Sequence, residues 1–215
     1  MYNIVRFNNT VIMGHLERKK RDQQNVRDGI LNAAINLAKS NGWNSVTIRK
    51  IAEAIEYTPP IVYEHFHNKD DLMREIIIYG FKKLRLLGEA RLSAKQDPKE
   101  WLLELSLVHW DFAFENSELY QLMFSLERPL PSEEATKGAL FIKEIFSKIS
   151  RLAEKELEVI IFNWVCLLNG TISMIMQFNK TEYPLENKFG LTSRELFIQF
   201  MQRFIKSIDT QQQNE

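Results

Sequence analysis

The sequence predicts an all-α protein, in which a small N-terminal three-helix unit precedes a longer all-helical domain. Apolar residues recur at the three- and four-residue spacing of amphipathic helices along most of the 215 residues. No stretch alternates long enough to predict strands, and 8 glycines with 6 prolines are too few for a fold of many tight turns. We divide the chain into a flexible basic arm at 1–24, a head at 25–75 and a helical domain at 76–215.

The first two helices of the head are bounded by clear local signals. Asn25 begins a helical pattern that Ser-Asn-Gly at 40–42 stops, and Gly42 suits a left-handed cap. Thr47 opens a second helix over 47–55, with apolar residues at helical spacing.

A third helix is predicted at 59–66, starting with two adjacent prolines. Pro59 and Pro60 suit a first turn, because the N–H groups there have no intrahelical partner. Thr58 is the predicted N-cap, and its hydroxyl should accept from the Ile61 N–H, since Pro60 has none.

A fourth helix starts after Asn68, the predicted N-cap, with Asp70 and Asp71 in its first turn, where the helix dipole favours carboxylates. It should reach about Arg91. Further helices are predicted at 99–115, 116–127, 133–153, 155–179 and 192–208, with a loop over 180–190.

The segment 159–179 carries no charged residue and is long enough to cross a bilayer. Polar residues recur through it, however, and its flanks lack a basic cluster. We therefore expect no membrane span, but a helix buried on two faces, one of them against a partner subunit.

Net charge is +0 over the whole chain but positive near its N-terminus, since residues 13–50 hold eight basic and three acidic side chains, a difference of +5.

Helices at 47–55 and 59–66, joined by about three residues, have the size of a helix-turn-helix. Side chains able to bind phosphate or a base edge surround this turn: Thr47, Arg49, Tyr63, His65 and Lys69. Together these observations favour a DNA-binding head.

Over about residues 25–75 the chain resembles the TetR/AcrR family of transcriptional regulators. The resemblance rests on residue types at fixed spacing: Gly42, Thr47, Ile51-Ala52, Tyr63, Phe66, Lys69 and Leu72. The resemblance implies that Thr47, Arg49, Tyr63, His65 and Lys69 contact DNA, and that Pro59, Pro60 and Ile61 read base edges or brace the reading helix. We count the N-cap Thr58 with these DNA-binding candidates. One departure is Glu56-Tyr57, where the family carries Gly and a small apolar residue. A left-handed turn at Glu56 is unfavourable by about 1 kcal/mol.

The resemblance further implies that the remaining helices form a ligand-sensing and dimerisation domain for a small, largely apolar effector. The long apolar surfaces at about 155–179 and 192–208 predict the contact of a homodimer, which would bind a palindromic operator as a repressor. A single cysteine fits a reducing cytosol, so we expect a cytoplasmic protein. An aromatic- and Met-rich composition agrees with a pocket, although the same residues could simply fill a core. The pocket candidates are Trp101, His109, Trp110, Phe112, Met123, Phe124, Phe141 and Trp164.

Other classes of function fit less well. His109 and Asp111 do not share a helix face, and Cys166, the single cysteine, suits a buried inert thiol, so no enzyme is expected and no cofactor. His65, His67, Asp70 and Asp71 lack the usual spacing of metal ligands, so no metal site is expected. The alternative left open is a helical dimeric ligand-binding or interaction protein with a non-functional DNA head.

Overall fold

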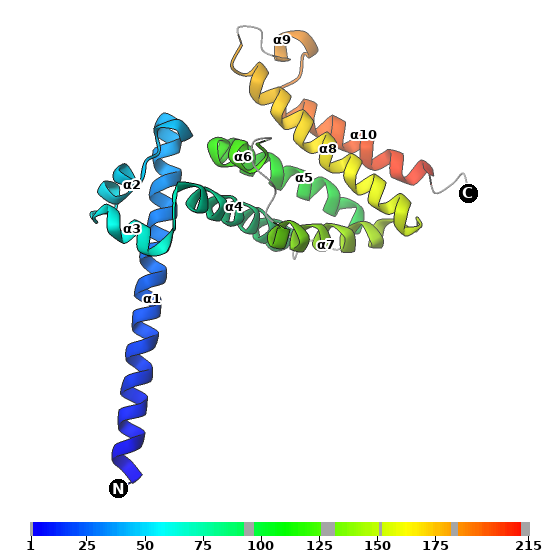
Figure 1. Ribbon diagram of the computed structural model, residues 1–215. Coiled ribbons are helices and arrows are strands. Elements are labelled where there is room, and N and C mark those ends of the chain that lie inside the picture. Colours follow the sequence, from blue (N-terminus) through cyan, green and yellow to red (C-terminus); the bar gives the residue numbers. More distant parts are fainter. Residues whose placement is uncertain (1, 93–96, 126–131, 151, 182–184, 212–215) are drawn as a thin grey trace. The chain divides into compact units, whose positions relative to one another are not determined.

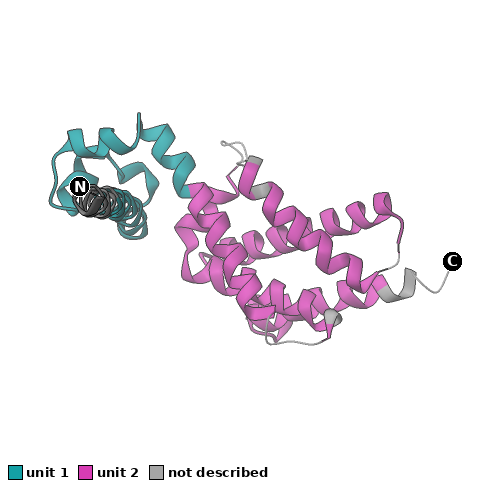
Figure 2. Cartoon of the chain, turned by 90° about the horizontal axis from the view of Figure 1, so that it is seen from below, with its two compact units in different colours: residues 1–76 teal, residues 77–215 magenta. Residues whose placement is uncertain are grey.

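The computed structural model describes residues 2–92, 97–125, 132–150, 152–181 and 185–211. Every regular element in these ranges is a helix, which confirms the predicted all-α fold (Figure 1). By compactness the chain falls into two units, Met1–Ile76 and Ile77–Glu215, coloured teal and magenta in Figure 2. The predicted boundary after residue 75 lies next to this division, while the roles assigned to the predicted segments stay predictions.

The first unit contains α1 (Tyr2–Asn41), the 3-10 helix η1 (Trp43–Ser45), α2 (Ile48–Ala54), α3 (Pro59–His65) and the start of α4 (Lys69–Leu92). The structure differs from the sequence prediction at 2–24, which belongs to α1 instead of forming a flexible arm. The physical reason is that this segment holds no proline and a single glycine, Gly14, so little in it disfavours a helix.

Glycine ends α1 as predicted, although in another backbone conformation. The Gly42 N–H donates to the Ala38 carbonyl oxygen at 2.7 Å. Its φ of 73° and ψ of 162° lie in a region that essentially only glycine adopts, which a left-handed helical cap would not use. The following helices pack on the apolar side of α1 around one core, formed by Ile30, Ala34, Ala38, Val46, Ile51, Ala52, Val62, Phe66, Leu72 and Ile76.

The second unit continues α4 and adds α5 (Pro98–Glu115), α6 (Ser117–Met123), α7 (Ser132–Ile149), α8 (Glu154–Phe178), α9 (Leu185–Phe189) and α10 (Ser193–Gln211). Helix α5 packs against α7, α8 and α10, so it is central to the unit. The short α9 lies where we predicted only a loop. Helix α7 ends at Ile149, earlier than the predicted 153, and the Leu152 N–H is bonded to the Ser150 hydroxyl instead of continuing the helix.

Helix α8 has one buried and one exposed face. Cys166 is exposed on this helix, so the prediction of a buried thiol was wrong. Leu157, Ile160, Trp164, Leu168, Ile172 and Ile175 are buried at helical spacing. Among the described residues α8 is the one helix long and apolar enough to cross a membrane, a property that core helices share. Because Trp164, Leu168 and Ile172 are at most 1% exposed, we assign α8 to the protein core.

Candidate nucleic-acid interface

The turn between α2 and α3 is closed by a complete helix C-terminal motif. The Tyr57 N–H donates to the Ala52 carbonyl at 2.9 Å, and the Glu56 N–H donates to the Glu53 carbonyl at 3.2 Å. These two bonds define a Schellman motif, which needs a left-handed residue after the C-cap. Glu56 is that residue, with φ of 60°, although glycine is the residue that fits there without strain.

Helix α2 is capped by a residue that we predicted to bind DNA. The Thr47 hydroxyl oxygen accepts from the Lys50 N–H at 3.3 Å, and Thr47 has the extended backbone of an N-cap. Its hydroxyl hydrogen remains available to a phosphate, since the cap uses only the oxygen as acceptor. Arg49, in the first turn of α2, is exposed.

Helix α3 starts at Pro59, with Thr58 as N-cap in an extended backbone conformation. The predicted hydrogen bond from the Ile61 N–H to the Thr58 hydroxyl is absent; that N–H donates instead to the Thr58 backbone carbonyl at 3.0 Å. Ile61 carries the first N–H group after the two prolines, and the carbonyl three residues earlier is directly within its reach. Pro60 and Tyr63 are exposed, and Tyr63 keeps 53% of its surface accessible.

The start of α4 is fixed by two hydrogen bonds around Lys69. The Asp71 N–H donates to the Asn68 side-chain oxygen at 2.8 Å, which confirms the predicted cap. The Asp71 carboxylate accepts from the His67 N–H at 3.1 Å. Among the described residues no group of three or more His, Cys, Asp and Glu side chains could hold a metal ion. Lys69 itself is exposed beside these bonds.

Arg27 has a role that the sequence did not indicate, since we counted it with the basic surface. From α1 its guanidinium donates to the His65 carbonyl at 3.0 Å, at the end of α3. It also pairs with the Glu75 carboxylate of α4 at 2.5 Å and lies 4.4 Å from the centre of the Phe66 ring. Arg27 therefore joins α1, α3 and α4 and fixes the end of the helix expected to read DNA.

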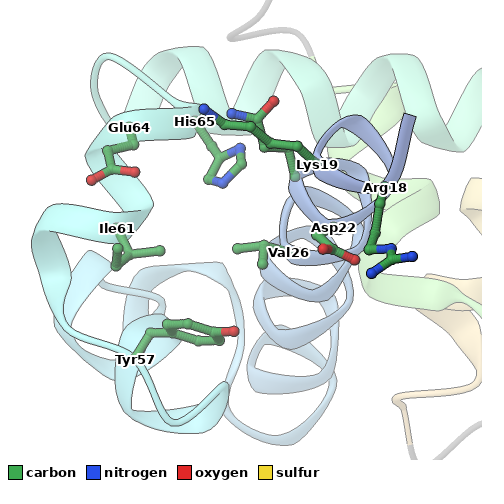
Figure 3. Close-up of a pocket in the computed structure, with 9 residues that line it drawn as sticks. Arg18, Lys19, Asp22, Val26, Tyr57, Ile61, Glu64 and His65 are labelled. Carbon is green, nitrogen blue, oxygen red and sulfur yellow. The ribbon is translucent and has the colours of Figure 1, made fainter. Parts of the chain in front are cut away.

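A groove runs between α1 and α3 on the outside of the first unit (Figure 3). Val26 of α1 and Ile61 of α3 face each other across it, and Tyr57 and His65 border it. The groove has a volume of about 310 Å³. Two predicted site residues, Ile61 and His65, thus share one wall, while Thr47 and Arg49 lie at the start of α2.

In the second unit four of the eight predicted pocket residues form part of the core. Trp110, Phe112, Met123 and Trp164 are buried. Trp101 and Phe141 are half-buried. Phe124 borders a cavity of about 220 Å³, formed with residues of α6, of α8 and the lysine that follows it: Tyr120, Gln121, Ser173, Met176, Gln177 and Lys180.

Polar groups accompany these aromatic side chains. The Trp164 indole N–H donates to the Ser106 hydroxyl at 3.1 Å, and His109 packs edge-on against the Trp164 ring. The His109 Nδ1–H donates to the Leu105 carbonyl at 3.0 Å, since a carbonyl only accepts. Burial lowers the pKa of His109, and burial also raises the pKa of Tyr120, whose hydroxyl donates to the Asn169 side chain at 2.6 Å.

The first unit matches a family known from sequence. Residues 30–76 fit the sequence model of "Bacterial regulatory proteins, tetR family". Over 93 residues the chain is 27% identical to the uncharacterized HTH-type transcriptional regulator YobS of Bacillus subtilis strain 168. That alignment covers 43% of this chain and 48% of YobS, so the chain spans about half the length of this curated relative.

Solved structures extend the likeness to the whole fold. A single-residue variant of TetR from Acinetobacter baumannii AYE, in complex with minocycline, superposes with a TM-score of 0.65 at 16% identity, covering 84% of this chain and 94% of that one. A TetR/AcrR-family transcriptional regulator from Thermobifida fusca YX-ER1 gives 0.61 at 17% identity, covering 84% and 97%. The first unit therefore carries the N-terminal DNA-binding domain of TetR-family transcriptional regulators, and the helical domain that follows it in the chain has the fold of solved regulators of that family.

Proposed function

We propose that the chain is a sequence-specific DNA-binding repressor that acts in the cytoplasm and is controlled by a small, largely apolar effector. The observation that carries this proposal is the exposed face of α3, where Pro60 and Tyr63 project from a helix held firmly by Arg27. A helix meant to enter the major groove needs such an unobstructed face on a rigid support.

The contacts divide by chemistry. Thr58, Pro59, Pro60 and Ile61 stand at the start of α3, where apolar side chains can meet thymine methyl groups in the major groove. The polar residues can bind phosphate and so set the position of α3: Thr47, Arg49, Tyr63, His65 and Lys69.

Selection of bound sequences from a random DNA pool tests this proposal directly. A palindromic consensus is expected, with binding that weakens steeply as salt rises. A pool that stays unenriched, with no binding even at low salt, would instead favour an interaction protein with a non-functional head.

The palindrome requires a homodimer, for which the exposed faces of α8 and α10 are the proposed surface. Phe162, Cys166, Gly170 and Met174 form one exposed stripe on α8, at four-residue spacing. The two outer side chains of this stripe, Phe162 and Met174, are large and the two inner ones are small, so the order of sizes is symmetric about position 168. A two-fold contact between antiparallel copies would set each Phe162 against a partner methionine, and the small residues would let the helices approach.

Gly170→Leu should therefore convert dimers to monomers in sedimentation velocity. Gly138→Leu on α7 is the matched control, since both glycines have open space where a Cβ would lie. Equal dimer fractions in the two variants would exclude a contact at Gly170.

The effector is proposed to bind the second unit. Minocycline binds one similar regulator, which supports a ligand site in this fold but does not identify the ligand here. The aromatic side chains around His109 and Trp164 suit an apolar molecule with few polar groups. A screen of apolar compounds for thermal stabilisation, followed by operator release, would identify it; a stabilising compound that leaves DNA binding unchanged would not be the effector.

A further inference from the structure

We infer that Lys19 and Lys20 of α1 form a second phosphate-contacting surface, which binds the DNA backbone beside the helix-turn-helix. This inference rests on the proposed DNA-binding function. None of the DNA-contacting positions that the family resemblance implies lies on α1.

Helix periodicity decides which basic residues of α1 face α3. Gln23 and Val26 line the groove, and Lys19 precedes them by four and seven residues, so it lies on the same face. Arg18 and Lys20 flank this face by about 100° each. Arg21 falls on the opposite side, and it borders neither this groove nor the cavity that adjoins it.

The adjoining cavity of about 510 Å³ continues the groove along α1. It shares Gln23, Glu64 and His65 with the first cavity and adds Lys20 to the lining. Lys19 and Lys20 therefore border one continuous groove beside His65, at the end of α3 that we assign to phosphate.

The basic side chains along this groove differ in availability. Arg27 is bonded to the His65 carbonyl and to Glu75, so its charge serves the fold. Arg18, Lys19 and Lys20 are exposed and pair with no other side chain that the structure describes. Exposed cations without a counterion attract phosphate, and their bound counterions are released when DNA binds.

The groove also has acidic residues, which disfavour a single small anion as its ligand. Asp22 and Glu64 line it, so a small free anion that entered would be repelled. A DNA duplex is too wide to enter a space between two helices. DNA carries successive phosphates along its backbone, so a duplex can meet the exposed lysines of α1 while it contacts His65 at the end of α3, and the DNA backbone is therefore the occupant that we propose.

The experiment compares two double variants that remove equal charge from one helix. Lys19→Ala with Lys20→Ala changes the groove side. Arg21→Ala with Lys39→Ala changes the opposite side, since Lys39 lies five helical turns after Arg21. All four residues are exposed on α1, and alanine favours helix, so both variants should fold. The full chain is titrated by fluorescence anisotropy against a labelled mixed-sequence duplex of about thirty base pairs, between about 50 and 200 mM salt.

The groove-side variant should bind roughly five-fold more weakly per lost contact at about 0.15 M salt, and its slope of log affinity against log salt should flatten by about 0.9 per contact. The opposite-side variant should stay near wild type. Equal losses in both variants would overturn the inference. So would stabilisation by inorganic phosphate that the groove-side variant lacks, because that result indicates a small-anion site.

Failure of the proposed function would look different. A wild-type chain that binds no duplex at low salt rejects DNA binding as a whole, and the inference with it. A wild type that binds and is weakened by Lys69→Ala, with the groove-side variant unaffected, rejects only the second surface.

Discussion

Replacing Arg27 with alanine tests whether one guanidinium fixes the helix that is proposed to read DNA. The variant loses a charged hydrogen bond to the His65 carbonyl at 3.0 Å, worth about 1.5–3 kcal/mol. It also loses a partly exposed ion pair with Glu75 and a contact with the Phe66 ring, each worth about 0.5–1 kcal/mol. Because the three interactions share one group they do not add fully, and we expect a loss of about 2–3 kcal/mol in the unfolding free energy of the first unit.

The assay must report on that unit alone. Trp43 is the single tryptophan among residues 1–76, so its fluorine signal in protein labelled with fluorotryptophan follows the unfolding of this unit in urea. Arg74→Ala is the matched control, since Arg74 is exposed and its nearest carboxylate, that of Asp71, lies 3.9 Å away. The control should cost less than about 0.5 kcal/mol.

The loss of unfolding free energy in Arg27→Lys should lie between the losses in Arg27→Ala and Arg74→Ala. Lysine keeps the positive charge but lacks the planar donors that reach two acceptors. The reasoning is refuted if Arg27→Ala is no more costly than Arg74→Ala. It is also refuted if the loss appears only in the tryptophan signals of the second unit.

Three further predictions follow from the same structure. Glu56→Gly should stabilise the first unit by about 0.5–1 kcal/mol, because glycine adopts a positive φ without strain; urea unfolding that shows a loss would contradict this. Tyr63→Phe and Lys69→Ala should weaken operator binding by roughly three- to ten-fold on all sequences alike, whereas a Pro59 change should alter base preference in a selection experiment. The phosphate assignment fails if either of the first two shifts preference at one base. Stability should fall as pH drops below 6.5, since burial lowers the pKa of folded His109 and the unfolded chain takes up the proton more readily. His109→Gln should reduce this slope, which is at most about 1.4 kcal/mol per pH unit for one group, and an unchanged slope would exclude His109 as its source.

Local chemistry explains which parts of the fold the sequence could predict. The ends of α2 and α3 and the start of α4 follow from residues within four positions of one another, such as the Asn68 cap and the proline pair. The strain at Glu56 could also be predicted from the sequence, because the family carries glycine at this position of the turn. Helix α9 was missed, since five residues carry too little periodicity to recognise.

Long-range packing explains the rest. The contacts of Arg27 join residues that lie 38 and 48 positions apart, and nothing near Arg27 in the chain distinguishes it from a surface arginine. Likewise, whether Trp164 lines a pocket or fills the core depends on how α5 packs on α8. Its bond to Ser106 spans 58 positions, and composition alone could not separate the two roles.

The hydrogen bonds around the start of α4 have a further consequence for the entropy of binding. Helix ends usually fray, and a residue that becomes ordered only on binding loses backbone freedom worth about 1–2 kcal/mol. Lys69 lies between Asn68 and Asp71, whose bonds already hold the first turn. On meeting a phosphate it would lose only the freedom of its side chain. The backbone that presents Lys69 would then already be ordered before DNA binds. The Asp71 amide should therefore resist hydrogen exchange as strongly in free protein as in the DNA complex.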